Sequence, residues 1–180
     1  MKILRNELNE GLNIRTQKNF PIDGIEFIDI TPLISQKETL EEITDKFVEE
    51  LKDKKIDYII APEARGFLFG APVAYKLGVG LVPVRKKGKL PPTVVDYSFE
   101  YEKEYGKDNL ELPKLSKGDD YAGKRVYLID DIYATGNTMS SIKLALTEAG
   151  AIVVGEGVVM NIKELNNNEK LFSLLDVNEE

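Results

Sequence analysis

The sequence predicts an α/β fold in which a central, mainly parallel sheet is flanked by helices. Short apolar runs at 56–60, 81–84, 125–130 and 151–159 are separated by segments whose apolar residues have helical spacing. Strands that alternate with helices in this way form parallel β-α-β units. A length of 180 residues suits one domain of ordinary size, so we expect a single domain over residues 1–180.

The first fifty residues contain two predicted helices and one extended segment. Residues 2–12 are expected to form a short helix with its leucines turned inward, and Ile25–Ile30 is expected to be extended. Ser35 with Glu38 matches a capping box, which predicts that a longer helix begins there. The apolar residues of that helix share one face at helical spacing: Leu40, Ile43, Phe47 and Leu51.

The middle of the chain is predicted to continue with a helix, a strand and a hairpin. Gly66–Leu77 has the pattern of a helix that ends at Gly78, and Pro83 predicts an edge position or a bulge in the next strand. The basic segment 85–93 is rich in glycine and proline, which predicts a mobile loop. The alternating polar and apolar residues after it, with an apolar return at Leu110–Leu112, predict a β-hairpin.

The composition excludes several classes of chemistry. The chain has no cysteine and no histidine, so disulfides, thiolate nucleophiles, zinc sites built on cysteine and histidine bases are excluded. A metal, if one is used, must be a hard cation that prefers oxygen, such as Mg²⁺. The formal net charge of −7 argues against a general nucleic-acid surface. No apolar run has membrane-spanning length and the N-terminus has no signal-peptide core, so we expect no membrane association and a cytoplasmic location.

One turn between a predicted strand and a predicted helix has the pattern of a phosphate-binding site. The unpaired N–H groups at a helix start and the positive end of its dipole attract an anion. Gly136 lets the backbone approach that anion closely, and two threonine hydroxyls add donors. The turn consists of Ala134, Thr135, Gly136, Asn137 and Thr138.

Two adjacent carboxylates, Asp130 and Asp131, precede this turn. A site for phosphate alone should not contain them, so they indicate a ligand with hydroxyl groups or a shared Mg²⁺, such as a ribose phosphate. The alternative is a plain strand-to-helix turn with aspartate as a cap and threonine as a turn former. A Walker A loop is excluded because Gly136 is not followed by Lys-Ser or Lys-Thr.

Three loops are predicted to meet at one edge of the sheet. Ligands of open α/β sheets bind beyond the carboxyl ends of the strands. Three segments each follow the carboxyl end of a predicted strand: Glu63–Gly66, Arg85–Lys89 and Asp130–Thr138. Two of these loops carry cations and the third carries acids and amides, so together they suit a phosphorylated sugar.

These motifs resemble a known family. The strand, acidic pair and Ala-Thr-Gly-x-Thr turn resemble the 5-phosphoribosyl-1-pyrophosphate (PRPP) signature of type I phosphoribosyltransferases. Within that class the chain resembles the adenine phosphoribosyltransferases from about Ile14 to about Val159. The segments that carry the resemblance, in order, are Phe20–Gly24, Phe27–Leu33, Ala64–Gly70, Arg85–Pro91 and Glu104–Gly106.

The resemblance implies a fold and a reaction. The fold would have a small hood from the N-terminal segment 1–34 and a flexible catalytic loop and hairpin over residues 85–106. The reaction would be purine salvage, in which adenine and PRPP give AMP and pyrophosphate. Mg²⁺ and a homodimer are also implied.

The resemblance further implies a role for each part of the site. Asp130 and Asp131 would hold the ribose and reach Mg²⁺ through water, and residues 134–138 would bind the 5-phosphate. Pyrophosphate would contact Ala64, Arg65, Gly66, Arg85, Lys86, Lys89 and Tyr105. Adenine would contact Glu26, Phe27 and Ile28. The catalytic residues would be Glu104, which shares a proton with the purine because no histidine is available, together with Arg65 and Lys89.

Three positions depart from the family pattern. Asn137 stands where the family often has glycine, and Pro92 replaces a usual glycine. Ile28 stands where an arginine is common, which bears on base affinity if that arginine contacts substrate. Two alternatives therefore stay open: a phosphoribosyltransferase for hypoxanthine, guanine, xanthine or orotate, and a non-catalytic regulator that senses PRPP.

Overall fold

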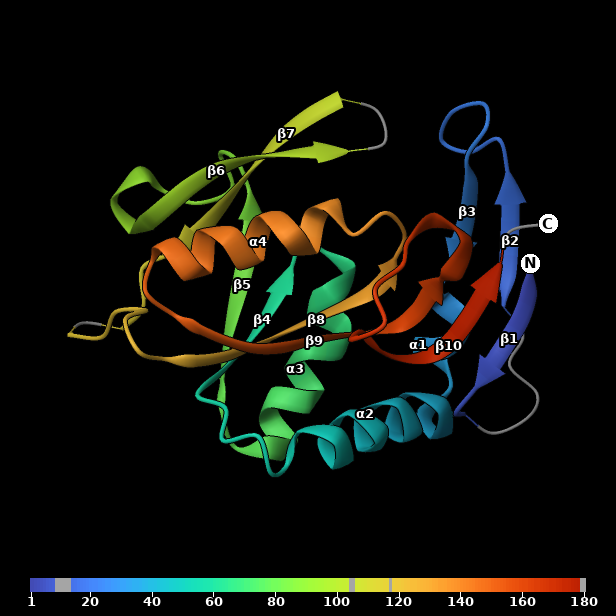
Figure 1. The fold of residues 1–180 in the computed structure, drawn as a ribbon, viewed down its shortest axis with the longest axis horizontal. Coiled ribbons are helices and arrows are strands. Elements are labelled where there is room, and N and C mark those ends of the chain that lie inside the picture. Colours follow the sequence, from blue (N-terminus) through green and yellow to red (C-terminus); the bar gives the residue numbers. More distant parts are fainter. Residues whose placement is uncertain (9–13, 104–105, 117, 179–180) are drawn as a thin grey trace.

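The computed structural model describes residues 1–8, 14–103, 106–116 and 118–178. Eight strands of this described part form one sheet in the order β1-β10-β9-β8-β4-β5-β7-β6 (Figure 1). Their bounds are β1 Lys2–Asn6, β4 Tyr58–Pro62, β5 Gly80–Lys86, β6 Val95–Lys103, β7 Gly106–Pro113, β8 Arg125–Tyr133, β9 Ile152–Ile162 and β10 Phe172–Asn178. A second sheet pairs β2 (Arg15–Lys18) with β3 (Glu26–Asp29).

The centre of the large sheet is parallel and its edges are antiparallel. Strands β10, β9, β8, β4 and β5 pair in parallel, whereas β1 pairs antiparallel with β10, and β7 pairs antiparallel with both β5 and β6. The predicted α/β class and the β6–β7 hairpin are therefore confirmed. The predicted edge position of the strand that contains Pro83 is wrong, because β5 lies between β4 and β7. Pro83 is tolerated because the β5–β7 ladder is formed at Arg85 and Lys86, after the proline.

Helices cover both faces of the sheet. They are α1 (Thr31–Ser35), α2 (Lys37–Leu51), α3 (Arg65–Leu77) and α4 (Asn137–Glu148), with short 3₁₀ turns η1 (Pro92–Val94) and η2 (Lys163–Leu165). Along β8, Tyr127 and Ile129 pack into a core with α2 and α3, while Val126 and Leu128 pack into a second core with α4. This alternation places α4 on one face and α2 with α3 on the other (Figure 1).

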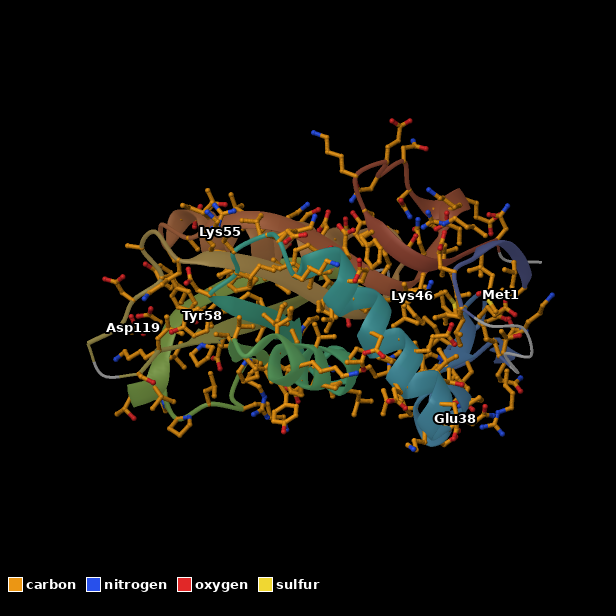
Figure 2. All side chains as sticks on the ribbon, turned by 90° about the horizontal axis from the view of Figure 1, so that it is seen from below. Met1, Glu38, Lys46, Lys55, Tyr58 and Asp119 are labelled. Carbon is orange, nitrogen blue, oxygen red and sulfur yellow. The ribbon has the colours of Figure 1, made fainter. Side chains whose placement is uncertain are left out.

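The helix α2 has the predicted face but not the predicted start. Ile43, Phe47 and Leu51 are buried, and Leu40 packs beside them. Figure 2 shows Glu38 and Lys46 on the outer side of this helix. The prediction that Ser35 caps this helix is wrong, because Ser35 ends α1 and Gln36 is the extended residue before α2. Pro32 favours an earlier helix start, since proline is well suited to a first turn.

The predicted helix over residues 2–12 is wrong for its first half. Lys2–Asn6 forms β1, which pairs with β10 from Lys2 opposite Asn178 to Asn6 opposite Leu175. The hydrogen bonds of pairing with β10 outweigh a weak local preference for helix. The strand β10 lies at the other end of the sequence, so local pattern does not reveal this pairing. Residues 9–13 of the predicted helix lie outside the described residues.

The helix α3 packs closely on β4 and ends where predicted. Gly78 caps it in the left-handed conformation, with φ of 69°. A Cβ atom on Gly70 would lie 2.9 Å from the Cβ of Ala61, so glycine sets how closely the helix approaches the strand. This close approach packs the second turn of α3 against β4 near its carboxyl end.

The substitution Gly70→Ala should destabilise the fold. Alanine normally stabilises a helix by about 1 kcal/mol relative to glycine, but overpacking against Ala61 should cost about 1–3 kcal/mol. We therefore expect a net fall in the free energy of unfolding, measured by urea denaturation. A gain near the helix-propensity value would show that α3 does not approach β4 this closely.

Candidate functional site

A cavity of about 820 Å³ opens beyond the carboxyl ends of β4 and β8. The hood strands β2 and β3 and the β6–β7 hairpin lie on the side toward which the arrowheads of these strands point (Figure 1). The walls of the cavity come from the hood, from the loop after β4, from the end of β5, and from the turn between β8 and α4. The three loops singled out in the sequence therefore meet at this edge of the sheet.

Most of the residues predicted for the site line this cavity. They are Glu26, Phe27, Ile28, Ala64, Arg65, Lys86, Asp130, Asp131, Ala134, Thr135 and Thr138. Three further predicted residues adjoin lining residues along the chain without lining the cavity themselves: Gly66, Gly136 and Asn137. Arg85 and Lys89 do not line the cavity either. Glu104 and Tyr105 lie outside the described residues.

The turn before α4 has the backbone geometry of an anion site. Gly136 has φ of 80° and is the residue before the helix. Its carbonyl accepts the first helical hydrogen bond, from the Ser140 N–H at 2.9 Å, so the N–H groups of residues 137–139 have no partner within the helix. A side chain at Gly136 would overlap the phenol of Tyr133, so this position requires glycine for space as well as for its φ.

The acidic pair lies within β8, close to its carboxyl end. Asp131 is only 4% exposed, and its N–H donates to Asp130 Oδ1 at 2.9 Å. Desolvation by the surrounding protein and the neighbouring Asp131 carboxylate raise the pKa of Asp130 well above its usual range, and Arg65 only partly opposes this. Burial and the neighbouring carboxylate therefore disfavour ionisation of Asp130.

Arg65 joins the acidic pair to the hood. Its Nε lies 2.7 Å from Asp131 Oδ2, and its Nη1 donates to the Ile28 carbonyl at 3.3 Å. The guanidinium carbon is also 5.7 Å from the centre of the Phe27 ring. Because Arg65 is the first residue of α3, where the helix dipole disfavours a cation, the nearby carboxylate accounts for its placement. The side chain is 41% exposed, so it is accessible from the cavity.

Gly66 lets the loop after β4 contact β8. A Cβ atom there would lie 2.8 Å from Pro62 Cδ, 3.0 Å from Asp130 Oδ1 and 3.1 Å from the Ile129 carbonyl oxygen. The peptide between Glu63 and Ala64 in the same loop is cis. Any residue other than glycine at position 66 would push the loop away from the acidic pair.

Glu63 holds the end of β5, a role that sequence reasoning missed. Its Oε2 accepts hydrogen bonds from the Lys86 N–H at 2.9 Å and from Arg85 Nε at 3.0 Å. These contacts, the Lys86 N–H first, hold the pKa of Glu63 below its usual range. Arg85 is therefore directed toward Glu63, with its guanidinium carbon 6.0 Å from the Phe67 ring, and Lys86 is the β5 cation that lines the cavity.

Several apolar lining residues were also missed in the sequence. Ile132, Ile162 and Leu165 close one side of the cavity, and Leu110 reaches it from β7. No motif marks them. The available signal was position, because Ile162 is the last residue of β9, a strand parallel to β8, and Leu165 follows shortly after it.

Comparisons with known proteins agree with this geometry. The phosphoribosyl transferase domain family matches residues 33–172. An adenine phosphoribosyltransferase of Clostridium botulinum (strain Loch Maree / Type A3) is 47% identical over 166 residues, covering 91% of this chain and 92% of the relative.

Solved structures show the same likeness. An adenine phosphoribosyltransferase of Thermoanaerobacter pseudethanolicus superposes with a TM-score of 0.82 at 40% identity, covering 91% of this chain and 95% of the other. That of Saccharomyces cerevisiae, solved with adenine and an imino-altritol bisphosphate, gives a TM-score of 0.80 at 37% identity and the same coverage.

The fold and the cavity define a type I phosphoribosyltransferase, an enzyme that transfers a phosphoribosyl group. The chain belongs to the adenine phosphoribosyltransferase family.

None of the helices in the described residues combines the length and the apolar character that a membrane span requires.

Replacing Asp130 should change the pH dependence of stability in a defined direction. A carboxyl group whose pKa is raised in the fold contributes stability below its unfolded pKa of about 3.9, and this is lost as pH rises through the raised value. Asp130→Asn should therefore be more stable than wild type at pH 7, and the difference should vanish toward pH 4. Urea denaturation at a series of pH values measures this.

Asp119 provides a control of opposite sign. Its carboxylate pairs with Lys124 at 2.7 Å and accepts a hydrogen bond from the Tyr58 hydroxyl at 2.9 Å, and these contacts lower its pKa. Figure 2 labels Tyr58 and Asp119 together at one end of the molecule. Asp119→Asn should be less stable than wild type at pH 7. Destabilisation by Asp130→Asn at every pH would contradict the raised pKa.

Proposed function

We propose that the chain carries out purine salvage by transferring the 5-phosphoribosyl group of PRPP to adenine, with AMP and pyrophosphate as products. One observation carries this proposal: a single cavity joins a phosphate-binding turn, an acidic pair and an aromatic ring beside an arginine. Each feature matches one part of the two substrates, and the family of the chain supports the same reaction.

The sugar phosphate binds at the end of β8. The N–H groups of residues 135–138 and the hydroxyls of Thr135 and Thr138 hold the 5-phosphate at the start of α4. Asp130 and Asp131 accept hydrogen bonds from the ribose hydroxyls. Their position at the cavity wall, next to this turn, supports the assignment.

Arg65 stabilises the leaving pyrophosphate. The bond from C1 of ribose to pyrophosphate breaks, a bond from C1 to a purine nitrogen forms, and negative charge collects on the leaving group. A guanidinium matches phosphate oxygens well, but Arg65 is paired with Asp131 in this structure. Pyrophosphate therefore competes with Asp131 for Arg65, and the carboxylate released by this exchange is available to the ribose. The pyrophosphate site is completed by the amides of Ala64 and Gly66 together with Lys86, Arg85, Lys89 and Tyr105.

Adenine binds against the hood. The Phe27 ring is 36% exposed at the cavity, so it offers a face for stacking. The Ile28 side chain is only 4% exposed and belongs to the core, so the backbone of Glu26 and Ile28 reads the edge of the base. Backbone donors and acceptors distinguish a 6-amino group from a 6-oxo group. The departure from arginine at Ile28 therefore leaves backbone recognition of the base in place.

The acidic pair also suits a hard cation. Carboxylate oxygens suit Mg²⁺, and Asp130 and Asp131 supply them at the cavity wall. Among the described residues, however, no group of three or more acidic side chains gathers to hold a metal alone. Asp130 and Asp131 would hold Mg²⁺ through water, and the ion would neutralise phosphate charge when bound.

A homodimer in the cytoplasm and a single domain over residues 1–180 complete the proposal. The family resemblance supports the dimer, and α3 and β5 carry exposed apolar side chains at Leu68, Tyr75 and Leu81 that a second copy can cover. Without cysteine the chain has no need of an oxidising compartment.

Incubation with free bases tests the proposal directly. With PRPP and Mg²⁺, adenine should give AMP and pyrophosphate, while hypoxanthine, guanine, xanthine and orotate should react at least about 100-fold more slowly, since a mismatched edge leaves buried polar groups unpaired. Chromatography of the products measures each rate. Faster turnover of another base would change the substrate. PRPP binding without pyrophosphate release from any base would favour a regulator.

The substitution Glu104→Gln tests the proton role. Loss of a general acid or base should lower kcat by about 10²–10⁴-fold, with little change in KM for PRPP. Glu102→Gln, two residues earlier on the same strand pattern, is the matched control and should keep the wild-type kcat. A change in KM alone, or equal effects of both substitutions, would remove Glu104 from proton transfer.

A further inference from the structure

The phosphate-binding turn is held from behind by an asparagine that no motif marks. Asn166 follows η2, and its side-chain amide donates to the Ala134 carbonyl at 2.9 Å. The same nitrogen lies 2.9 Å from Asn161 Oδ1 and 3.0 Å from the Ile162 carbonyl oxygen. One amide group therefore joins the turn after β8 to the end of β9.

This amide is the outer end of a buried polar network. Asn161 is fully buried, and its own amide nitrogen lies 3.4 Å from Asp176 Oδ1 in β10. Asp176 also accepts a hydrogen bond from the Ser173 hydroxyl at 2.5 Å and pairs with Arg5 of β1 at 3.4 Å. The acceptors that orient Asn166 are thus fixed by three strands of the sheet.

Asn168 braces the same turn through the side chain of Tyr133, the residue before Ala134. Its amide nitrogen donates to the Tyr133 hydroxyl at 3.2 Å and to Glu156 Oε1 at 2.7 Å. Glu156 is buried and also pairs with Lys143 of α4 at 2.8 Å. Because the Tyr133 phenol occupies the space beside Gly136, Asn168 fixes the ring against which the turn closes.

We infer that Asn166 is a positioning residue for the 5-phosphate site, an inference that rests on the proposed function. A carbonyl oxygen directed into an anion site repels the anion. By donating to the Ala134 carbonyl, Asn166 keeps that oxygen directed toward the protein, so the N–H groups that follow face the cavity. Preorganised donors bind a phosphate without a further cost of ordering the loop.

Asn167 gives a matched control within the same triplet. It has the same side chain and adjoins both bracing residues, but it is exposed and its backbone carbonyl accepts only a local turn bond from the Glu169 N–H at 3.1 Å. Asn167→Ala therefore removes an equal number of atoms without altering the hold on Ala134.

Steady-state kinetics with PRPP and adenine varied separately test the inference. Asn166→Ala and Asn166→Asp should raise KM for PRPP about tenfold, the effect of losing roughly one hydrogen bond, while KM for adenine changes less than twofold. The aspartate variant keeps the size of the side chain and the oxygen that accepts the Asn168 N–H at 3.1 Å. Asn167→Ala should match wild type. Thermal unfolding of each variant accompanies the kinetics.

Binding of ribose 5-phosphate separates this inference from the proposed function. In ¹⁵N NMR titrations, the amides of residues 135–138 should shift in wild type and in Asn167→Ala, and saturation of both Asn166 variants should need about tenfold more ligand. If wild type makes no AMP, the proposed function fails and this titration alone decides the role of Asn166. Unchanged affinity in the variants overturns the inference. Parallel increases in both KM values, or loss of cooperative unfolding in both variants, also overturn it, because Asn166 would then be a purely structural residue.

Discussion

The ion pair between Arg65 and Asp131 is the contact on which the arrangement of the site depends. Asp131 is buried at the end of β8, and an unpaired charge there would cost several kcal/mol. Arg65 meets that charge at 2.7 Å while also contacting the carbonyl of Ile28 and the ring of Phe27. One guanidinium therefore joins the loop after β4, the acidic pair and the hood, which come from three distant parts of the chain. In the function that we propose, the same cation binds pyrophosphate, so ligand binding and the contacts that assemble the site share one side chain.

Close backbone packing makes this contact possible. Gly66 lets the loop after β4 touch β8, and Gly136 lets the next turn close against Tyr133. Behind that turn, Asn166 carries the constraint into the buried polar residues of β9 and β10. The acids and amides that face the cavity are thus held in place by close backbone packing and by buried polar contacts behind the cavity wall, which is how a preorganised site is built.

The sequence predicts the parts of the molecule that depend on local pattern. Alternating strands and helices predict the α/β class, and the Gly136 turn predicts the phosphate site. Each strand, helix or turn in these patterns is recognised from a short stretch of neighbouring residues. Contacts between distant segments are not predictable in this way. The pairing of β1 with β10, the hold of Glu63 on Arg85 and the brace from Asn166 to Ala134 each need the folded chain.

We propose above all that the turn from Ala134 to Thr138 binds the 5-phosphate while Asp130 and Asp131 hold the sugar. A crystal structure of the chain with ribose 5-phosphate tests it most directly. We expect phosphate oxygens within hydrogen-bonding distance of the N–H groups of residues 135–138, with ribose hydroxyls at the two carboxylates. Phosphate bound elsewhere in the cavity, with this turn unoccupied, would contradict it.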